Sequence, residues 1–233
     1  FTSVYSLTPY TLISKSPINS PADLVGKKYR SPGTVWDRWV NYVGGTPVTV
    51  SAAEMFESLD RGGIDVVVFS PTGLQAYSLW DVAKYDTMLS LGTYHVLSIF
   101  TMNQGTWKRL TNTERKVILN GAAMGSMGTA VGFIDRNKVV LKQAKDHGVT
   151  ISKPSEALVR QRNEFIEHDI DNIIQLAETR YKITDAARWI SKYRELLTKW
   201  GAIVKSTSGN REKMVDAMRL EIYDKLDPAN FGR

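Results

Sequence analysis

The first hundred residues alternate short apolar runs with segments whose apolar positions recur at helical spacing. The run from Ile64 to Phe69 is interrupted only by Asp65, which is typical of a strand covered on both faces. Alternating strands and helices predict an α/β lobe with a largely parallel sheet. The other expected strands are Thr8 to Ser14, Lys27 to Ser31 and Pro47 to Val50, and the expected helical segments are 20–26, 36–43, 51–60 and one after Gly73 that contains Trp80.

The second half of the chain is almost entirely helical in pattern. Met88 to Met102 is rich in β-branched and aromatic residues, so it is expected to be a strand. A long helix is then expected from Asn112 or Thr113 to about His147. The remaining expected elements are a strand over Val149 to Ser152, helices from Pro154 onward and a last helix over Arg211 to Leu226.

Two of the helical segments have distinctive apolar patterns. Val117 to Ile134 carries no charge over 18 residues, which is near the lower length limit for a membrane span. Its polar residues and four glycines lower its hydrophobicity, so we expect a buried helix of a soluble protein whose glycines admit a neighbouring helix. The later segment carries one apolar stripe at helical spacing, formed by Trp189, Tyr193, Leu196, Leu197, Trp200, Ile203 and Val204.

Composition excludes several classes of protein. The chain has 233 residues, of which 42% are hydrophobic and 23% charged, as in an ordinary globular domain. The formal net charge of +6 comes from Lys and Arg scattered among Asp and Glu, without a basic run interleaved with aromatics, so nucleic-acid binding is not expected. Because the chain contains no cysteine, disulfides, zinc–thiolate sites and cysteine nucleophiles are excluded.

Candidates for catalysis are few. His95, His147 and His168 are far apart in sequence and match no metal-binding spacing. The sequence also lacks a GxSxG nucleophile motif, a P-loop and a dinucleotide-binding glycine motif. We therefore predict no catalytic residue, cofactor or metal, while an enzyme whose site is assembled from distant residues stays an alternative.

Five phrases of the sequence resemble, in the correct order, those of the DctP-type solute receptors of TRAP transporters. The segment PINSPADLVGKKYRSPG resembles the phrase DLKG-x-K-x-R-x-P, in which the arginine binds the ligand. The other phrases are GGTPVTVSAAEMFESLDRGGIDVV, WDVAKY, FTMNQGTWKRLTNTERKVI and YDKLDPANFG. Together they cover most of Pro17 to Ile118 and then Tyr223 to Gly232, and five in order make the match specific.

This resemblance implies an α/β, two-lobed fold of the periplasmic-binding-protein type II class, with a long connecting helix and a helical C-terminal region. Residues 1–6 would be a remnant of the hinge and first lobe, and residues 7–94 the α/β ligand-binding lobe. Residues 95–133 would return to the first lobe and begin the long helix, which continues into the helical region 134–233. The family's first lobe starts about a hundred residues upstream, so its N-terminal part is expected to be missing here.

The resemblance places ligand binding at Arg30. A guanidinium offers two parallel donors to a carboxylate and stays charged when it is shielded from water. Arg30 follows an expected strand and precedes Pro32 and Gly33, where α/β proteins bind ligands at a sheet edge. A surface salt bridge is the alternative role for this arginine. The other candidate binding residues are Tyr10, Gly33, Trp36, Phe69 and Ser70.

Departures from the family pattern bear on the ligand. Tyr10 occupies the place of a second arginine that acidic-branch receptors often carry, and Phe69 or Ser70 the place of a polar binding residue. A single arginine in apolar and aromatic surroundings predicts a monocarboxylate or keto acid with an apolar or aromatic body. The acidic residue of metal-dependent relatives is not evident in VVVFSPTG, so no metal is predicted.

The resemblance implies a periplasmic receptor that binds a small organic acid and delivers it to the membrane subunits of a TRAP transporter. A receptor that feeds a sensor protein and an enzyme on the same scaffold are the alternatives. The long helix is compatible with a monomer or a dimer.

Overall fold

The computed structural model describes residues 3–232, except for the side chains of residues 3–5 and 96–100. Its internal contacts divide the chain into two compact units. Unit 1 comprises residues 1–7, 95–133 and 176–233, and unit 2 comprises residues 8–94 and 134–175. Each unit thus gathers segments that are distant in the sequence.

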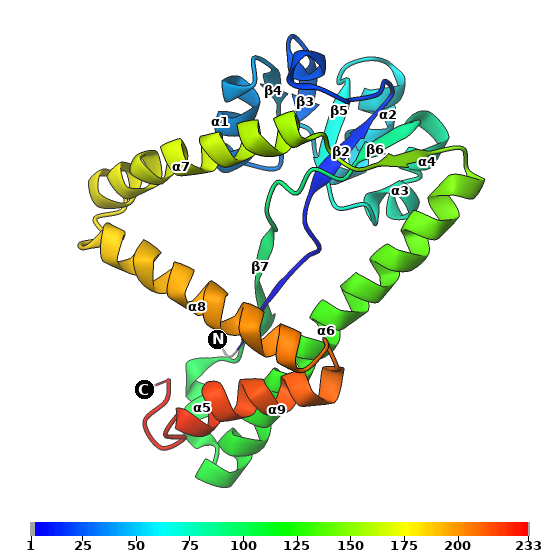
Figure 1. The fold of residues 1–233 in the computed structure, drawn as a ribbon. Helices are drawn as coiled ribbons and strands as arrows, with labels where there is room; N and C mark the ends of the chain where they lie inside the picture. The colour runs from blue at the N-terminus through cyan, green and yellow to red at the C-terminus, as the bar shows by residue number, and fades with distance from the viewer. Residues whose placement is uncertain (1–2, 233) are drawn as a thin grey trace. The chain divides into compact units, whose positions relative to one another are not determined.

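Unit 2 is built on a six-stranded mixed sheet (Figure 1). Its strands, in spatial order, are β4 (Thr46–Val48), β3 (Lys28–Arg30), β5 (Val66–Phe69), β2 (Thr11–Ser14), β6 (Tyr85–Thr87) and β8 (Thr150–Ser152). Three pairs are parallel, but β2 is antiparallel to both β5 and β6, so the prediction of a largely parallel sheet is wrong at its centre. β2 pairs with β5 and β6, which are distant from it in the sequence, so the apolar pattern of β2 itself does not specify the direction of this pairing.

Two further strands differ from the prediction. β6 was not expected, because it has only three residues and the charged Asp86 stands at its middle. The strand expected over Met88 to Met102 is confined to β7 (His95–Phe100), and the residues that precede β7 form a loop. Short strands with a central charge give no alternation that sequence reading can detect.

The helices that belong to unit 2, wholly or in part, are α1 (Thr34–Tyr42), α2 (Met55–Asp60), α3 (Gly73–Ala76), α4 (Leu79–Val82), α6 (Asn112–Asp146) and α7 (Glu156–Thr179). The expected capping box forms before α2: the Ser51 hydroxyl donates to Glu54 at 2.6 Å and the Ser51 amide donates to the same carboxylate at 3.1 Å. The single helix expected around Trp80 is instead split into α3 and α4. Ser78 adopts a left-handed backbone conformation with φ of 51° and separates the two turns.

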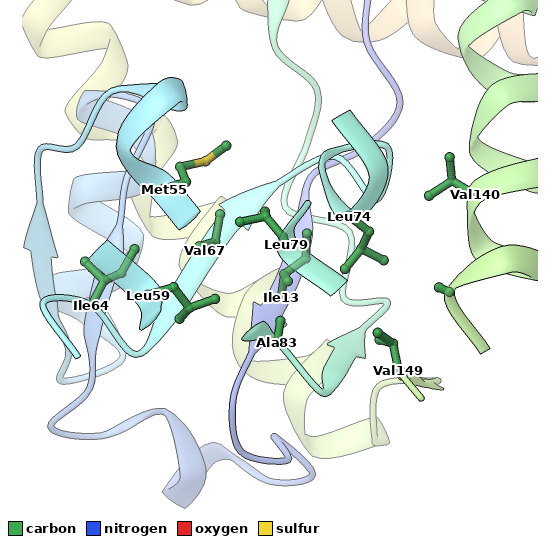
Figure 2. Close-up of a cluster of buried hydrophobic side chains, with 11 residues drawn as sticks. Ile13, Met55, Leu59, Ile64, Val67, Leu74, Leu79, Ala83, Val140 and Val149 are labelled. Atoms are coloured by element: carbon green, nitrogen blue, oxygen red, sulfur yellow. The ribbon is translucent and has the colours of Figure 1, made fainter. Parts of the chain in front are cut away.

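Both faces of the sheet are covered, as the apolar run in β5 predicted. Tyr29 and Val66 share one face, where the Tyr29 ring packs edge-on against Trp39 of α1 at 6.0 Å between centroids. Ile13 and Val67 share the other face and pack against α2, α3, α4 and the end of α6 (Figure 2). That second cluster consists of Ile13, Met55, Leu59, Ile64, Val67, Leu74, Leu79, Ala83, Val140, Ala144 and Val149.

The long helix α6 extends from Asn112 to Asp146, which confirms the predicted element. Its uncharged stretch is not buried as expected, because only one face packs, while Val117, Met124 and Ile134 are exposed. Of the glycines there, Gly128 lies against the guanidinium of Arg211 rather than against a helix backbone. Within residues 3–232, α6 alone is long and apolar enough to cross a membrane, a criterion that long helices of soluble proteins also meet.

Unit 1 is mainly helical. Its strands β1 (Ser3–Ser6) and β7 pair antiparallel, and its other helices are α5 (Gln104–Arg109), α8 (Ala186–Ser206) and α9 (Arg211–Glu221). Arg115 of α6 donates to the carbonyls of Trp107 at 3.1 Å and Pro228 at 3.0 Å, which fastens the C-terminal segment. The apolar stripe of α8 follows helical spacing as predicted, but it is exposed in the described structure, with Trp189 at 61% and Tyr193 at 51%.

Candidate functional site

One edge of the unit 2 sheet collects most of the predicted binding residues. Arg30 ends β3 and Phe69 ends β5, and because these strands are parallel, both residues leave the sheet at the same edge. β2 runs the opposite way, and Thr11 pairs with Phe69, so Tyr10 reaches this edge just before its strand begins. We call the set of side chains around this edge the Arg30 cluster: Arg30, Tyr10, Trp36, Phe69, Tyr77 and Tyr94.

Arg30 is a buried cation. Its residue surface is only 8% exposed, and its guanidinium donates to two backbone carbonyls, Val50 at 3.2 Å and Val68 at 3.1 Å. No carboxylate forms an ion pair with it in the described part of the chain, so the surface salt bridge considered above is not its role. Burial lowers the pKa of Arg30 from its usual value, although the guanidinium stays charged. Two neutral carbonyls leave three of its five N–H donors without a described partner.

Aromatic rings surround this cation. The Arg30 guanidinium lies over the Phe69 ring at 5.3 Å from the centroid. Tyr10 stacks on Phe69 with centroids 5.2 Å apart and on Trp36 at 5.4 Å, so these predicted site residues do lie together. Tyr77 meets the Phe69 ring edge-on at 5.5 Å.

The loop before β7 completes the cluster. Tyr10 and the loop exchange two backbone hydrogen bonds, from the Tyr10 amide to Gly92 at 2.8 Å and from the Leu91 amide to Tyr10 at 2.9 Å. The Trp36 indole N–H donates to the Leu91 carbonyl at 3.0 Å. These bonds bring Tyr94 into a stack with Tyr10 at 6.4 Å and with Trp36 at 6.3 Å. Sequence reasoning missed Tyr94, because its segment was expected to be a strand, and it also missed Tyr77.

Ser70 and Gly33 differ from the other predicted residues. The Ser70 hydroxyl is engaged with the hydroxyls of Thr8 at 2.8 Å and Thr72 at 2.7 Å, and the residue is 1% exposed. It therefore fixes the backbone after Phe69 and forms no hydrogen bond with Arg30 in the described structure. Gly33 precedes α1, and a methyl group at its α-carbon would meet no atom within 4 Å.

Other polar groups in the part of the chain that the structure describes form no comparable site. Among the described residues, no group of three His, Asp or Glu side chains is placed to hold a metal ion. His147 stacks on Trp80 at 4.0 Å between ring centroids, so both side chains are engaged in packing. A hollow of about 600 Å³ lies along α7, but its polar residues Arg160, Glu164 and His168 are exposed and of mixed charge.

Comparison with models of protein families shows the family to which the chain belongs. The profile of the bacterial extracellular solute-binding proteins, family 7, matches residues 8–175, which is more than two thirds of the sequence. The chain belongs to this family. The DctP-type resemblance inferred from the five sequence phrases is therefore confirmed, and the matched region includes every residue of the Arg30 cluster.

One curated protein and two solved structures illustrate what the chain is similar to. A solute-binding protein of Roseobacter denitrificans is 30% identical over 149 residues, covering 62% of this chain and 42% of its own length. A marine metagenome TRAP solute-binding protein specific for aromatic acid ligands is 25% identical, with a TM-score of 0.73, covering 85% of this chain and 63% of that one. A TRAP periplasmic protein of Desulfovibrio salexigens with bound orotic acid is 18% identical, with a TM-score of 0.70, covering 83% and 61%.

These likenesses confirm the predicted fold class, an α/β solute-binding fold of type II with a long helix. The chain spans less than half the length of the Roseobacter denitrificans solute-binding protein and about three fifths of the solved structures.

Proposed function

We propose that this chain is the acid-binding part of a periplasmic receptor that delivers a small organic acid to the membrane subunits of a TRAP transporter. The observation that carries the proposal is Arg30, a buried guanidinium held by two backbone carbonyls and left without a carboxylate partner. A buried charge is costly unless it is paired, so an anionic ligand is the natural partner.

The comparisons support an organic acid as that ligand. Solved relatives carry orotic acid, pyroglutamic acid, mandelate or aromatic acids, and each of these ligands has a carboxylate group. Family 7 consists of solute-binding proteins, which favours binding over catalysis as the function of this chain. The same kinship supports delivery to TRAP membrane subunits and a periplasmic location. Transport itself would be carried out by those membrane subunits.

The role of Arg30 is tested by isothermal titration of the complete natural polypeptide with a panel of small carboxylic acids. Arg30→Ala is expected to weaken binding of the best acid about a hundredfold or more, because the carboxylate loses its charged partner. Arg30→Lys keeps the charge but loses the bidentate geometry, so we expect a smaller loss. The wild type, but not Arg30→Ala, should gain about 2.7 kcal/mol of stability at a hundred times its dissociation constant.

Arg61→Ala is the matched control, since Arg61 is an exposed arginine of the same unit that pairs only with Glu57 on the surface. It should leave acid binding unchanged. Acid binding that persists at full strength in Arg30→Ala would show that the carboxylate is held elsewhere.

A further inference from the structure

Tyr10 lies at the centre of the Arg30 cluster. It is 3% exposed and stacks on three rings, those of Trp36, Phe69 and Tyr94. Trp36 and Phe69 are partly buried and Tyr94 is 43% exposed, so all three rings keep some surface open to a ligand. A planar apolar group beside the guanidinium would therefore meet ring faces rather than polar side chains.

The Tyr10 hydroxyl is a donor without a described acceptor. No hydrogen bond joins it to another group in the described part of the chain, although its ring is almost fully buried. Burial raises the pKa of Tyr10 to about 12, and the nearby Arg30 charge opposes that rise. The phenol is therefore neutral and protonated at ordinary pH, and it remains able to donate one hydrogen bond close to the guanidinium.

The cluster holds one positive charge and no acidic side chain. A ligand with one carboxylate would be neutralised by Arg30, whereas a second carboxylate would lie among aromatic rings without a cation. Hydroxyl groups of a sugar acid would lose their hydrogen bonds to water against these ring faces without gaining new ones, which weakens binding.

We propose that the ligand is an aromatic monocarboxylate, with its carboxylate on Arg30 and the Tyr10 hydroxyl and its ring against Phe69, Trp36 and Tyr94. This inference rests on the proposed function and names the class of acid. Tyr10 adds a neutral donor beside the one cation of the cluster, which favours a ligand with a single negative charge. Phe69, Trp36 and Tyr94 select for a planar body, because stacked rings attract one another beyond simple burial.

The inference is tested by titrating the complete natural polypeptide with phenylacetate, cyclohexylacetate, succinate and D-galacturonate. Phenylacetate and cyclohexylacetate have the same charge and nearly the same size, but only phenylacetate has a planar ring. We expect phenylacetate to bind about tenfold more tightly than cyclohexylacetate. Its advantage in affinity over succinate and D-galacturonate should be larger than tenfold.

Two variants separate the two parts of the proposal. Tyr10→Phe keeps the ring and should weaken both ring acids about tenfold while preserving the preference for phenylacetate. Phe69→Leu should bring the ratio of the two ring acids close to one. Tyr42→Phe, which removes a hydroxyl from a tyrosine that packs on Phe165, serves as the control. It should change neither the affinity for the two ring acids nor the preference for phenylacetate.

The outcomes distinguish this inference from the proposed function. Tightest binding of succinate or galacturonate that depends on Arg30 would overturn the aromatic class and leave the receptor function standing. Equal affinity for the two ring acids in the wild type would also overturn it. The absence of Arg30-dependent binding of any acid would overturn both proposals.

Discussion

Replacing Arg38 with methionine is expected to destabilise the protein by about 3–5 kcal/mol, because it leaves the buried carboxylate of Asp169 without its cation and with only the Asn172 amide as a hydrogen-bond donor, at 3.4 Å. The two side chains join α1 to α7 through two short bonds, 2.6 Å from Nε to Oδ1 and 2.8 Å from Nη2 to Oδ2. The Asp169 side chain is 4% exposed, whereas that of Arg38 is 27% exposed. Hydrogen bonding to Asp169 raises the pKa of Arg38, as expected of a guanidinium that binds a carboxylate through two parallel hydrogen bonds.

Because the two side chains differ in exposure, replacing Arg38 and replacing Asp169 should cost different amounts of stability. In Asp169→Asn the charged partner, Arg38, still reaches water, so this variant should lose less stability than Arg38→Met. A double variant, Arg38→Met with Asp169→Leu, should recover much of the loss, because an apolar pair of similar size carries no buried charge. Urea unfolding of the single and double variants measures these differences as changes in the free energy of unfolding.

Arg160→Ala is the control for this series, since Arg160 is an exposed arginine on α7. It should change the free energy of unfolding by less than about 0.5 kcal/mol. Equal losses in Arg38→Met and Asp169→Asn would contradict the assignment of the burial cost to the carboxylate.

The position of the site edge could be predicted from sequence, because it depends on where strands end. Arg30 and Phe69 stand at the ends of two strands that the apolar pattern located, and parallel strands bring such residues to one edge. Tyr10 reaches the same edge only because β2 is antiparallel, a direction that the short apolar runs did not reveal. Its inclusion among the candidates came from the family phrase and not from the pattern.

The remainder of the cluster depends on tertiary contacts that leave no local signal. Tyr94 joins it because backbone bonds between Tyr10 and the residues Leu91 and Gly92 turn the loop toward β2. Similarly, the periodicity of α8 identifies which side chains share a face, but burial of that face is set by what packs against it. Trp189 and Leu197 accordingly follow the predicted stripe and are nevertheless exposed by 61% and 55%.

Asp86 is the charged residue at the middle of β6 that kept this strand from being predicted. It also gives the second prediction with a large expected effect, a change of stability with pH. It pairs with Ile13 of β2 and Ile151 of β8 and is completely buried. Neither carboxylate oxygen has a well-formed hydrogen bond, and the nearby Thr11 hydroxyl already lies 3.3 Å from the Phe69 carbonyl as a donor. Burial raises the pKa of Asp86 from 3.8 to about 7, and Thr11 offsets only part of that rise.

A raised pKa means that the folded protein holds the proton that the unfolded chain has lost. The stability is therefore fully present below about pH 4 and falls as the pH rises toward and through about 7. The difference between the two pKa values corresponds to about 4 kcal/mol of unfolding free energy. Above pH 7, the folded state carries an unpaired buried carboxylate, which is the condition that the rise in pKa reflects.

Asp86→Asn removes the titration while keeping the shape of the side chain. We expect urea unfolding to show this variant more stable than the wild type by about 4 kcal/mol at pH 9, with the difference vanishing near pH 4. Asp60→Asn, which alters an exposed carboxylate of α2, should leave the pH profile of the wild type unchanged. If the Asp86→Asn and wild-type profiles ran parallel from pH 4 to pH 9, Asp86 would have to be stably ionised in the folded protein. In that case a polar partner would hold its charge, and the centre of the sheet would tolerate the carboxylate without a proton.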